Sequence, residues 1–358
     1  NGFERSERQN SGGTVRLALA LGGGAARGLA HIGVLGVFER EGIRPDCIVG
    51  SSMGGLIGAL SASGLCAGEI SEIAREFRFP RRFVPGGMLR WDSLFGSAGP
   101  ALSGSFEGLA THLAITAVDL EAGTQVILHT GPLLPAVRAT CSVPGVLPPI
   151  RLGGRWLADG GLVNLLPVDV AWMTDPDLVV AVKVGAPRER PVPQLNWRVT
   201  ALLTRFGEVV PNPATAKVAL EVLVRATEIL LDRQTALASA MTGPEVLIEP
   251  DLGDLGLRDF HRLDEAEAAG RRAAEMMLPE VLRLLESPPD VPAAGERELS
   301  LRFDPVCGMV ISPTRARASA SHGDIAYYFC SPNCRDCFER DPDDYLGKPL
   351  LAFGVRNG

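Results

Sequence analysis

The sequence predicts an α/β fold in which helices cover a mostly parallel central sheet. Short apolar runs bounded by glycine or polar residues, such as TVRLALAL at 14–21 and DLVVAVKV at 177–184, are typical of buried parallel strands. In the first part of the chain, short apolar runs alternate with segments of helical periodicity. This order of strand, helix, strand and helix is the pattern of parallel α/β proteins. Hydrophobic residues make up 46% of the 358 residues, which is enough for a sizeable buried core.

The elements can be predicted in order along the chain. The strand at 14–21 leads through a glycine-rich loop into a helix, because the residues after Gly28 have helical periodicity and end on Gly42. The next expected elements are a strand at 46–49 and helices at 53–62 and 67–77. After a loop rich in Arg, Phe, Gly and Pro at 78–105, we expect strands at 113–119 and 124–129, a helix at 132–141, a strand at 177–184, helices at 198–207 and 214–241, a strand at 245–249 and a helix at 261–286.

A change in composition divides the chain into two domains. SPPDVPAAGERELS at 287–300 is a polar, proline-bearing linker. It separates an α/β domain over 14–286 from a small α+β module over 301–348, which holds four of the seven cysteines. We expect residues 1–13 to be a disordered lead-in and 349–358 to be a tail.

Charge and hydropathy exclude several classes of protein. The net charge of −7 argues against a general nucleic-acid binder, which usually has a basic surplus. No apolar run reaches the roughly 18 residues of a membrane span, and the polar N-terminal segment lacks the apolar core of a signal peptide. Seven cysteines without an export signal indicate a reducing compartment. We therefore expect a cytoplasmic protein with no nucleic-acid partner.

A G-x-S-x-G motif lies between a predicted strand and a predicted helix. A sharp turn between two such elements lifts the hydroxyl of Ser52 clear of the sheet, as a nucleophile requires. The flanking Gly50 and Gly54 permit the tight backbone. In a chain with 41 glycines, an ordinary glycine turn is the alternative.

A second glycine-rich element precedes the first predicted helix. Consecutive glycines at a helix N-terminus let backbone N–H groups converge on an anion. A P-loop does not fit, because no Lys-Ser/Thr pair follows Gly28, and a dinucleotide fingerprint fits poorly, because Arg27 replaces its third glycine. An oxyanion hole for acyl transfer fits better. The loop residues concerned are Gly22, Gly23, Gly24, Ala25, Arg27 and Gly28.

Asp159, followed by Gly160 and Gly161, is the candidate base, although an aspartate before two glycines is also a common turn. A Ser–Asp–His triad would use His261, but that residue begins an amphipathic helix and is better placed as a surface or capping residue. His31 follows the glycine loop and is expected to pack in the core. A Ser–Asp dyad needs no histidine.

These motifs carry a resemblance to a known family. GGGAARGLAHIGVL, DCIVGSSMGG and ATCSVPGVLPPIRLGGRWLADGGLVNLLPV resemble the bacterial branch of the patatin-like phospholipase family, over roughly residues 14–285. The resemblance implies a patatin-like three-layer sandwich and a lipid acyl hydrolase. It maps the nucleophile onto Ser52, the base onto Asp159 and the oxyanion loop onto 22–28, with Ala25 where many relatives carry glycine. The implied substrates are phospholipids or lysophospholipids, with an acyl-serine intermediate and no cofactor for catalysis.

A basic and aromatic segment at 75–91 is a candidate membrane contact. It combines five arginines with Phe77, Phe79, Phe83 and Trp91. Such an edge would place the protein at the periphery of an anionic bilayer. The alternative is a loop whose aromatic rings fold back on the core. Nothing in the sequence indicates the oligomeric state.

The C-terminal module has the features of a small metal site. Ser331 and Pro332 are good starting residues for a helix, on which Cys334 and Cys337 share a face. Cys330 lies just before that helix, where the helix dipole favours a thiolate. A segment this short has a weak core and often needs a metal ion.

This module, over about 303–346, resembles a YHS domain, a metal-associated fold. The resemblance maps metal ligands onto Cys307, Cys330 and Cys334, with His322 and Cys337 as further candidates. Thiolates suit zinc, copper(I) or iron, and the alternative is a set of buried reduced cysteines without metal. The other cysteines, Cys47, Cys66 and Cys141, are expected to be packing residues.

The sequence thus predicts a serine lipid acyl hydrolase joined to a metal-associated module that regulates it. Two alternatives from other classes stay open. One is a metal-sensing or trafficking protein whose patatin-like domain binds lipid without catalysis. The other is a nucleotide-binding oxidoreductase that uses the glycine loop.

Overall fold

The computed structural model describes residues 15–79, 89–185 and 243–288, together with isolated positions of 226–235 and parts of 302–345. Some predicted elements lie outside these residues. They are the lead-in, the tail, most of the linker, the helix at 198–207 and all of the helix at 214–241 except helical positions between 226 and 235.

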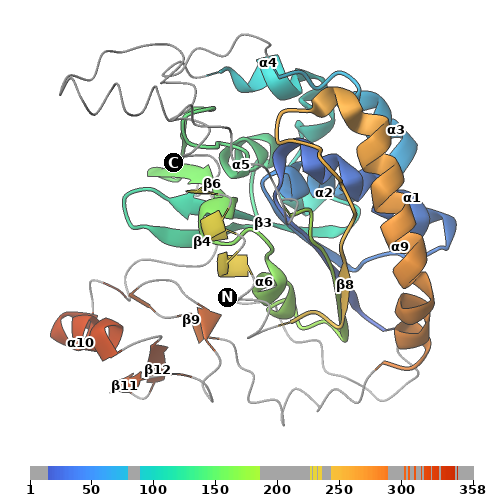
Figure 1. Cartoon of the computed structure of the whole chain (residues 1–358). Helices are drawn as coiled ribbons and strands as arrows, with labels where there is room; N and C mark the ends of the chain where they lie inside the picture. Colours follow the sequence, from blue (N-terminus) through green and yellow to red (C-terminus); the bar gives the residue numbers. More distant parts are fainter. Residues whose placement is uncertain are drawn as a thin grey trace, which may run out of the picture.

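An eight-stranded mixed sheet forms the centre of the α/β domain (Figure 1). Its order is β5-β6-β3-β2-β1-β7-β8, with β4 paired to β3. The five strands from β3 to β8 in this order are parallel, whereas β4, β5 and β6 run antiparallel to their neighbours. The strands are β1 Leu17–Leu21, β2 Cys47–Ser51, β3 His112–Asp119, β4 Thr124–Leu128, β5 Ile150–Leu152, β6 Arg155–Asp159, β7 Leu178–Val182 and β8 Val246–Ile248. The predicted α/β class is confirmed.

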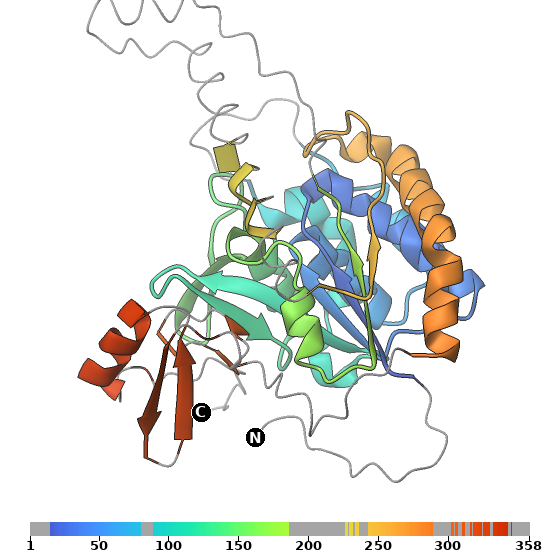
Figure 2. The same cartoon turned by 60° about the horizontal axis from the view of Figure 1, so that its bottom comes forward.

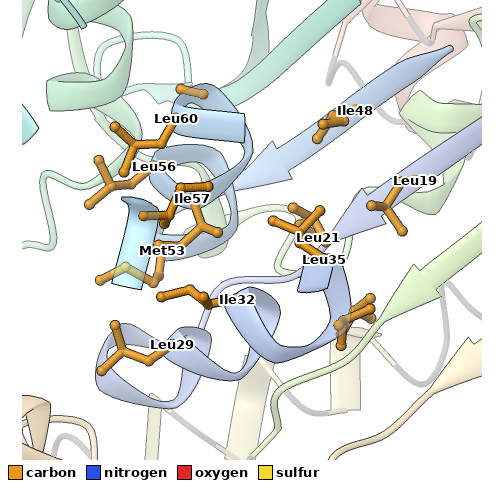
Figure 3. Packing of buried hydrophobic residues seen from close by; sticks show 14 of the residues in the cluster. Leu19, Leu21, Leu29, Ile32, Leu35, Ile48, Met53, Leu56, Ile57 and Leu60 are labelled. Atoms are coloured by element: carbon orange, nitrogen blue, oxygen red, sulfur yellow. The ribbon is translucent and has the colours of Figure 1, made fainter. Parts of the chain in front are cut away.

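Helices cover both faces of the sheet, because successive residues of its buried strands point to opposite sides. On one side, alternate residues of β1 such as Leu19 and Leu21 pack against apolar residues of α1 and α2, including Ile32 and Leu56 (Figure 3). On the other side, the intervening alanines of β1 pack under α6. The helices are α1 Ala30–Arg40, α2 Met53–Ala62, α3 Ala67–Ala74, α4 Trp91–Phe95, α5 Leu133–Thr140, α6 Val168–Trp172 and α9 Leu263–Glu286.

The long helix α9 crosses α1 at very short range (Figure 1). A Cβ atom built on Gly33 would lie 2.0 Å from the carbonyl oxygen of Glu267, and one on Gly270 would lie 1.9 Å from that of Ala30. Side chains at these two positions would force the helices apart. The crossing therefore requires glycine on both helices.

The α/β domain differs from the sequence prediction in several places, one of which is the short helix α6, which was not predicted. The hairpin of β5 and β6 was not predicted, because its strands are short and lie in a region rich in proline and glycine. Gly153 and Gly154 turn this hairpin with positive φ angles of 57° and 82°. The expected loop at 78–105 contains α4 and short 3-10 segments.

The described residues of the C-terminal module form two small antiparallel hairpins and one helix (Figure 2). Strands β9 Arg302–Phe303 and β10 Val310–Ile311 pair with each other, as do β11 Ala318–His322 and β12 Ile325–Phe329. Helix α10, Pro332–Arg340, begins at the predicted proline. The ring of Phe338 is buried against Tyr327 and Phe329, with centroids 4.8 Å and 5.3 Å away.

Candidate active site

Strand β3 brings the ends of two other strands together. Ser51, the last residue of β2, pairs with Thr116, and Asp159, the last residue of β6, pairs with the adjacent Ala117. Because β2 runs parallel to β3 and β6 runs antiparallel to it, their carboxyl ends meet along one edge of β3. Residues more than 100 positions apart in the sequence therefore become neighbours.

Ser52 lies on the sharp turn between β2 and α2. Its φ of 52° and ψ of −123° are unusual for a residue with a side chain. The turn is tight because β1, β2 and α2 approach closely. A Cβ atom on Gly54 would lie 2.1 Å from the carbonyl oxygen of Leu21, and one on Gly50 would lie 2.5 Å from the Cα of Gly55.

The structure brings Ser52 and Asp159 into direct contact. The Ser52 hydroxyl donates a hydrogen bond of 2.6 Å to Oδ2 of Asp159, and the backbone N–H of Gly161 donates one of 2.7 Å to Oδ1. Both side chains are largely shielded, since Ser52 is 7% and Asp159 5% exposed. Each carboxylate oxygen thus has a partner that fixes its direction.

Burial raises the pKa of Asp159 from 3.8 to about 6. Removal from water disfavours the charged carboxylate, and the hydrogen bonds from Ser52 and Gly161 oppose this effect only in part. A carboxylate with this pKa is a stronger base than an exposed one and is still mostly ionised at neutral pH.

Glycines also let the residues after Asp159 reach β3. A Cβ atom on Gly160 would lie 2.3 Å from the carbonyl oxygen of Thr116, and one on Gly161 would lie 2.9 Å from Oδ1 of Asp159. Larger residues at these positions would push the aspartate away from β3 and thus from Ser52.

The glycine loop lies directly beside Ser52, since a Cβ atom on Gly23 would be 3.0 Å from the Cβ of Ser52. Two of its N–H groups are already occupied: Gly22 donates to Val182 at 3.0 Å and Gly23 to Leu165 at 2.8 Å. The sequence prediction that they also serve as oxyanion donors is therefore corrected.

The N–H groups of Gly24 and Ala25 make no hydrogen bond in the described part of the chain. They stand at the start of the 3-10 helix Ala25–Leu29, where backbone N–H groups have no partner within the helix. Ala25 has a φ of 48°, the left-handed region that glycine adopts most easily. This conformation gives a physical reason for the glycine that the family resemblance places here.

Two buried side chains, Arg27 and His31, hold the glycine loop through hydrogen bonds to backbone carbonyls. Arg27 is buried, and its Nε donates a hydrogen bond of 3.0 Å to the carbonyl of Leu255. His31 is also buried, and its Nε2 lies 2.7 Å from the carbonyl oxygen of Gly22, so this nitrogen carries the proton. Burial lowers the pKa of His31 to about 4, which keeps the ring neutral. Its packing role was expected, but its bond to the loop was not.

The remaining loop residue, Gly28, packs against α2, since a Cβ atom built there would lie 2.4 Å from Cγ of Met53. His261, the alternative base, is exposed in the 3-10 helix Phe260–Arg262. Among the described residues, no histidine is hydrogen-bonded to Ser52 or Asp159.

Sequence reasoning missed two residues of the site. The Thr140 hydroxyl accepts a hydrogen bond of 2.8 Å from the N–H of Ser52. Leu165 lies between the two glycine motifs, with Cδ1 2.8 Å and 2.9 Å from Cβ atoms built on Gly23 and Gly161. Both belong to the block that carries the resemblance, but neither residue type has a chemical signature of its own.

In the described part of the candidate membrane segment, the aromatic residues are mostly part of the core, which is the alternative that the sequence left open. Phe77 is fully buried and stacks edge-to-face on Phe95 at 5.1 Å, and Trp91 is buried as well. Phe79 is partly buried and carries the guanidinium of Arg258 over its ring. Phe83 lies outside the described residues. No helix among the residues with assigned positions is both long and apolar enough to cross a membrane.

The predicted metal ligands are only partly described. Cys307 and Cys330 lie outside the described residues. Cys337 Sγ lies 3.1 Å from the guanidinium of Arg340, and His322 is exposed. His322, Cys334 and Cys337 form no metal-binding group of three ligands in the described positions of the module.

The remaining cysteines take two kinds of position. Cys47 and Cys141 are buried, as expected of packing residues. Cys66 is exposed at the start of α3, where Glu69 accepts a hydrogen bond from its N–H, so its predicted packing role is wrong.

Comparisons with known proteins agree with this architecture. Residues 19–116 and 111–172 match the model of the patatin-like phospholipase family, and 303–348 match the YHS domain. An uncharacterized NTE family protein of Mycobacterium tuberculosis is 30% identical over 78% of this chain and 48% of its own length. Another, from Mycobacterium bovis, is 34% identical over 54% of this chain and 56% of its own length. The chain thus spans about half the length of these curated relatives.

Two further relatives extend the comparison. Patatin-like phospholipase domain-containing protein 6 of Mus musculus is 29% identical over 75% of this chain and 21% of its own length. Among solved structures, VipD from Legionella pneumophila aligns with a TM-score of 0.42 and 12% identity, over 75% of this chain and 67% of that one. The chain contains a patatin-like phospholipase domain followed by a C-terminal YHS domain.

Proposed function

We propose that the protein is a serine hydrolase of lipid esters, with Ser52 as nucleophile and Asp159 as base. The observation that carries the proposal is the 2.6 Å hydrogen bond between the Ser52 hydroxyl and Asp159. The N–H groups of Gly24 and Ala25 are the proposed oxyanion donors. The proposed substrates are phospholipids or lysophospholipids, because the family to which the domain is similar is named for phospholipase activity.

In the first half of the reaction, the Ser52 oxygen attacks the carbonyl carbon of the ester while Asp159 accepts the hydroxyl proton. The loop N–H groups stabilise the resulting oxyanion. The tetrahedral intermediate then collapses, the bond to the alcohol oxygen breaks, and Asp159 returns the proton to that oxygen. An acyl-serine ester and a free alcohol, such as a lysolipid, result.

In the second half, Asp159 accepts a proton from water, whose oxygen attacks the acyl-serine. Collapse of the second intermediate returns that proton to the Ser52 oxygen and releases the fatty acid. Two features support an aspartate in this role. The raised pKa of Asp159 strengthens it as a base, and the bond from Gly161 fixes its orientation.

The proposal is tested with purified full chain, a fluorophosphonate probe and a panel of esters from short soluble esters to phospholipids. We expect wild type to be labelled and to hydrolyse esters, and Ser52→Ala to do neither. Asp159→Asn, which keeps the size of the side chain, should reduce kcat by about 1000-fold or more. Undiminished hydrolysis by Ser52→Ala would refute this assignment.

Two binding measurements on the same proteins separate the alternatives. A non-catalytic lipid-binding domain would bind lipid vesicles equally well as wild type and as Ser52→Ala, without turnover by either. An oxidoreductase would bind a nucleotide at the glycine loop, which a titration with NAD or NADP would detect.

We propose further that the YHS domain binds a soft metal ion such as zinc, copper(I) or iron and thereby regulates hydrolysis. The support is the similarity to the YHS model and the thiol-rich composition of this segment. The residues proposed to hold the ion are Cys307, Cys330 and Cys334. Metal content and ester hydrolysis of the full chain should both change in the triple Cys→Ser variant, whereas unchanged metal content would contradict the site.

A further inference from the structure

Three consecutive residues at the end of α5 contact the backbone of Ser52 or of Asp159. The hydroxyl of Thr140 accepts the bond from the N–H of Ser52, and Cys141 Sγ donates one of 3.5 Å to the carbonyl of Ser52. The carbonyl of Ser142 accepts a bond of 3.1 Å from the N–H of Asp159. We call residues 140–142 the α5 clamp, because they hold both members of the dyad.

The backbone of Ser52 needs such support. Its φ of 52° lies in a region that a residue with a side chain adopts only where its surroundings hold it. The carbonyl of Ser52 is also held by α2, through a bond of 3.1 Å from the N–H of Leu56. The N–H of Ser52 donates no comparable hydrogen bond to α2. Thr140 is therefore the partner that holds the N–H of Ser52 in place.

The clamp is also connected to α4 near the surface. Arg138 donates a hydrogen bond of 2.7 Å to Asp92 of α4, and its guanidinium lies over the ring of Trp91 at 5.1 Å. The hydroxyl of Ser142 donates a bond of 2.7 Å to the carbonyl of Arg138. The end of α5 thus contacts α4 on one side and holds the turn at Ser52 on the other.

We propose that Thr140 is a positioning residue, whose hydroxyl aims the Ser52 oxygen at Asp159 by holding the Ser52 N–H. This inference rests on the proposed function and deepens it. A serine oxygen displaced by a fraction of an ångström loses its bond to Asp159 and its alignment with the glycine loop. Small displacements of reacting groups are known to reduce rates strongly.

The test compares two identical substitutions at buried threonines. Thr140→Val removes the acceptor and nearly keeps the shape. Thr124→Val is the matched control, because Thr124 is also buried, lies on β4 and has no contact with Ser52, Asp159 or the glycine motifs among the described residues. For a soluble short-chain ester, we expect Thr140→Val to lower kcat by about 10- to 100-fold with little change in KM. Thr124→Val and Thr140→Ser should stay within about 3-fold of wild type.

A second readout separates positioning from a general loss of stability. The hydrogen bond from Ser52 lowers the pKa of Asp159, against the larger effect of burial. When Ser52 moves away, this pKa rises, so the acid limb of kcat/KM should shift to higher pH in Thr140→Val. In Thr124→Val the acid limb should not shift.

Each outcome bears on a different claim. Thr140→Val activity within about 3-fold of wild type, with an unmoved acid limb and an inactive Ser52→Ala, overturns the role of Thr140 and leaves the proposed function intact. A loss that Thr140→Ser fails to restore also overturns it. Activity in Ser52→Ala overturns the proposed function instead. Where Thr140→Val folds poorly by circular dichroism, Thr140→Ala is compared with Thr140→Ser per folded molecule.

Discussion

The patatin-like domain and the YHS domain are built by different means. In the patatin-like domain, backbone approaches backbone at glycines, as at the crossing of α1 and α9 and around Ser52. In the described part of the YHS domain, the interior is formed by rings, with Tyr327, Phe329 and Tyr345 around Phe338. A large core can hold main-chain groups in fixed positions, and the proposed oxyanion donors are such groups. A small domain depends on a few large side chains.

The largest expected effect is on the smaller domain. Phe338→Ala removes its central ring, at a cost of about 3–5 kcal/mol, which is comparable to the whole stability of such a small domain. Hydrogen exchange should show that 318–340 loses protection while the strands β1 and β2 keep theirs. Loss of protection in both places would show that the two domains fold as one unit.

The second test concerns the backbone contacts of the large domain. Gly33→Ala should lower the free energy of unfolding by about 3 kcal/mol, because the new methyl group meets the carbonyl of Glu267. Gly36→Ala on the same helix is the control, since its Cβ would lie 3.4 Å from Ala67. In Gly36→Ala, the better helix propensity of alanine should raise the free energy of unfolding by about 0.5 kcal/mol. Denaturant titration measures the free energy of unfolding of both variants. Equal changes in Gly33→Ala and Gly36→Ala would contradict the close crossing of α1 and α9.

The third test uses the buried charge of the site. The pKa of Asp159 is about 6 in the folded protein and 3.8 ordinarily, so the folded state binds its proton more tightly than the unfolded state does. Stability from this group is present at low pH and is lost as pH rises between these two values, by about 3 kcal/mol in total. Asp159→Asn should therefore be more stable than wild type by about this amount near pH 8 and equally stable near pH 4. A difference that does not vary with pH would point to packing instead of charge.

The smallest expected effect is at the glycine loop. Ala25→Gly relieves the strain of a φ of 48° but makes the unfolded chain more flexible. The two effects nearly cancel, and we expect the free energy of unfolding to rise by about 0.5 kcal/mol. Thermal or denaturant unfolding would measure this change. Activity should change little, because the N–H group is retained. A clear loss of stability would show that the alanine side chain contributes packing that outweighs its strain.

Several features of the site could be predicted from local pattern. The glycine-bounded apolar run at 14–21 and the G-x-S-x-G motif depend on neighbouring residues, so they predicted β1 and the turn at Ser52. The helix α2, Met53–Ala62, has the bounds that the sequence predicted. The hairpin of β5 and β6 could not be predicted, because its short strands take their partners from β3 and from each other.

Local pattern left two interpretations open where packing decides exposure. Phe77 and Trp91 lie in a segment with five arginines, which suggested a membrane edge. In the structure their rings pack against Phe95. Burial of a ring depends on residues distant in the sequence, and composition does not contain that information.

By itself, the sequence determined the α/β class, the order of the main elements and the residue types of the candidate dyad, since these follow from periodicity and from motifs a few residues long. Only the tertiary structure decided which loop amides are free, and that Thr140 holds the N–H of Ser52. The reason is that a hydrogen bond needs a partner within about 3 Å, and the partners here are supplied by strands and helices from distant parts of the chain.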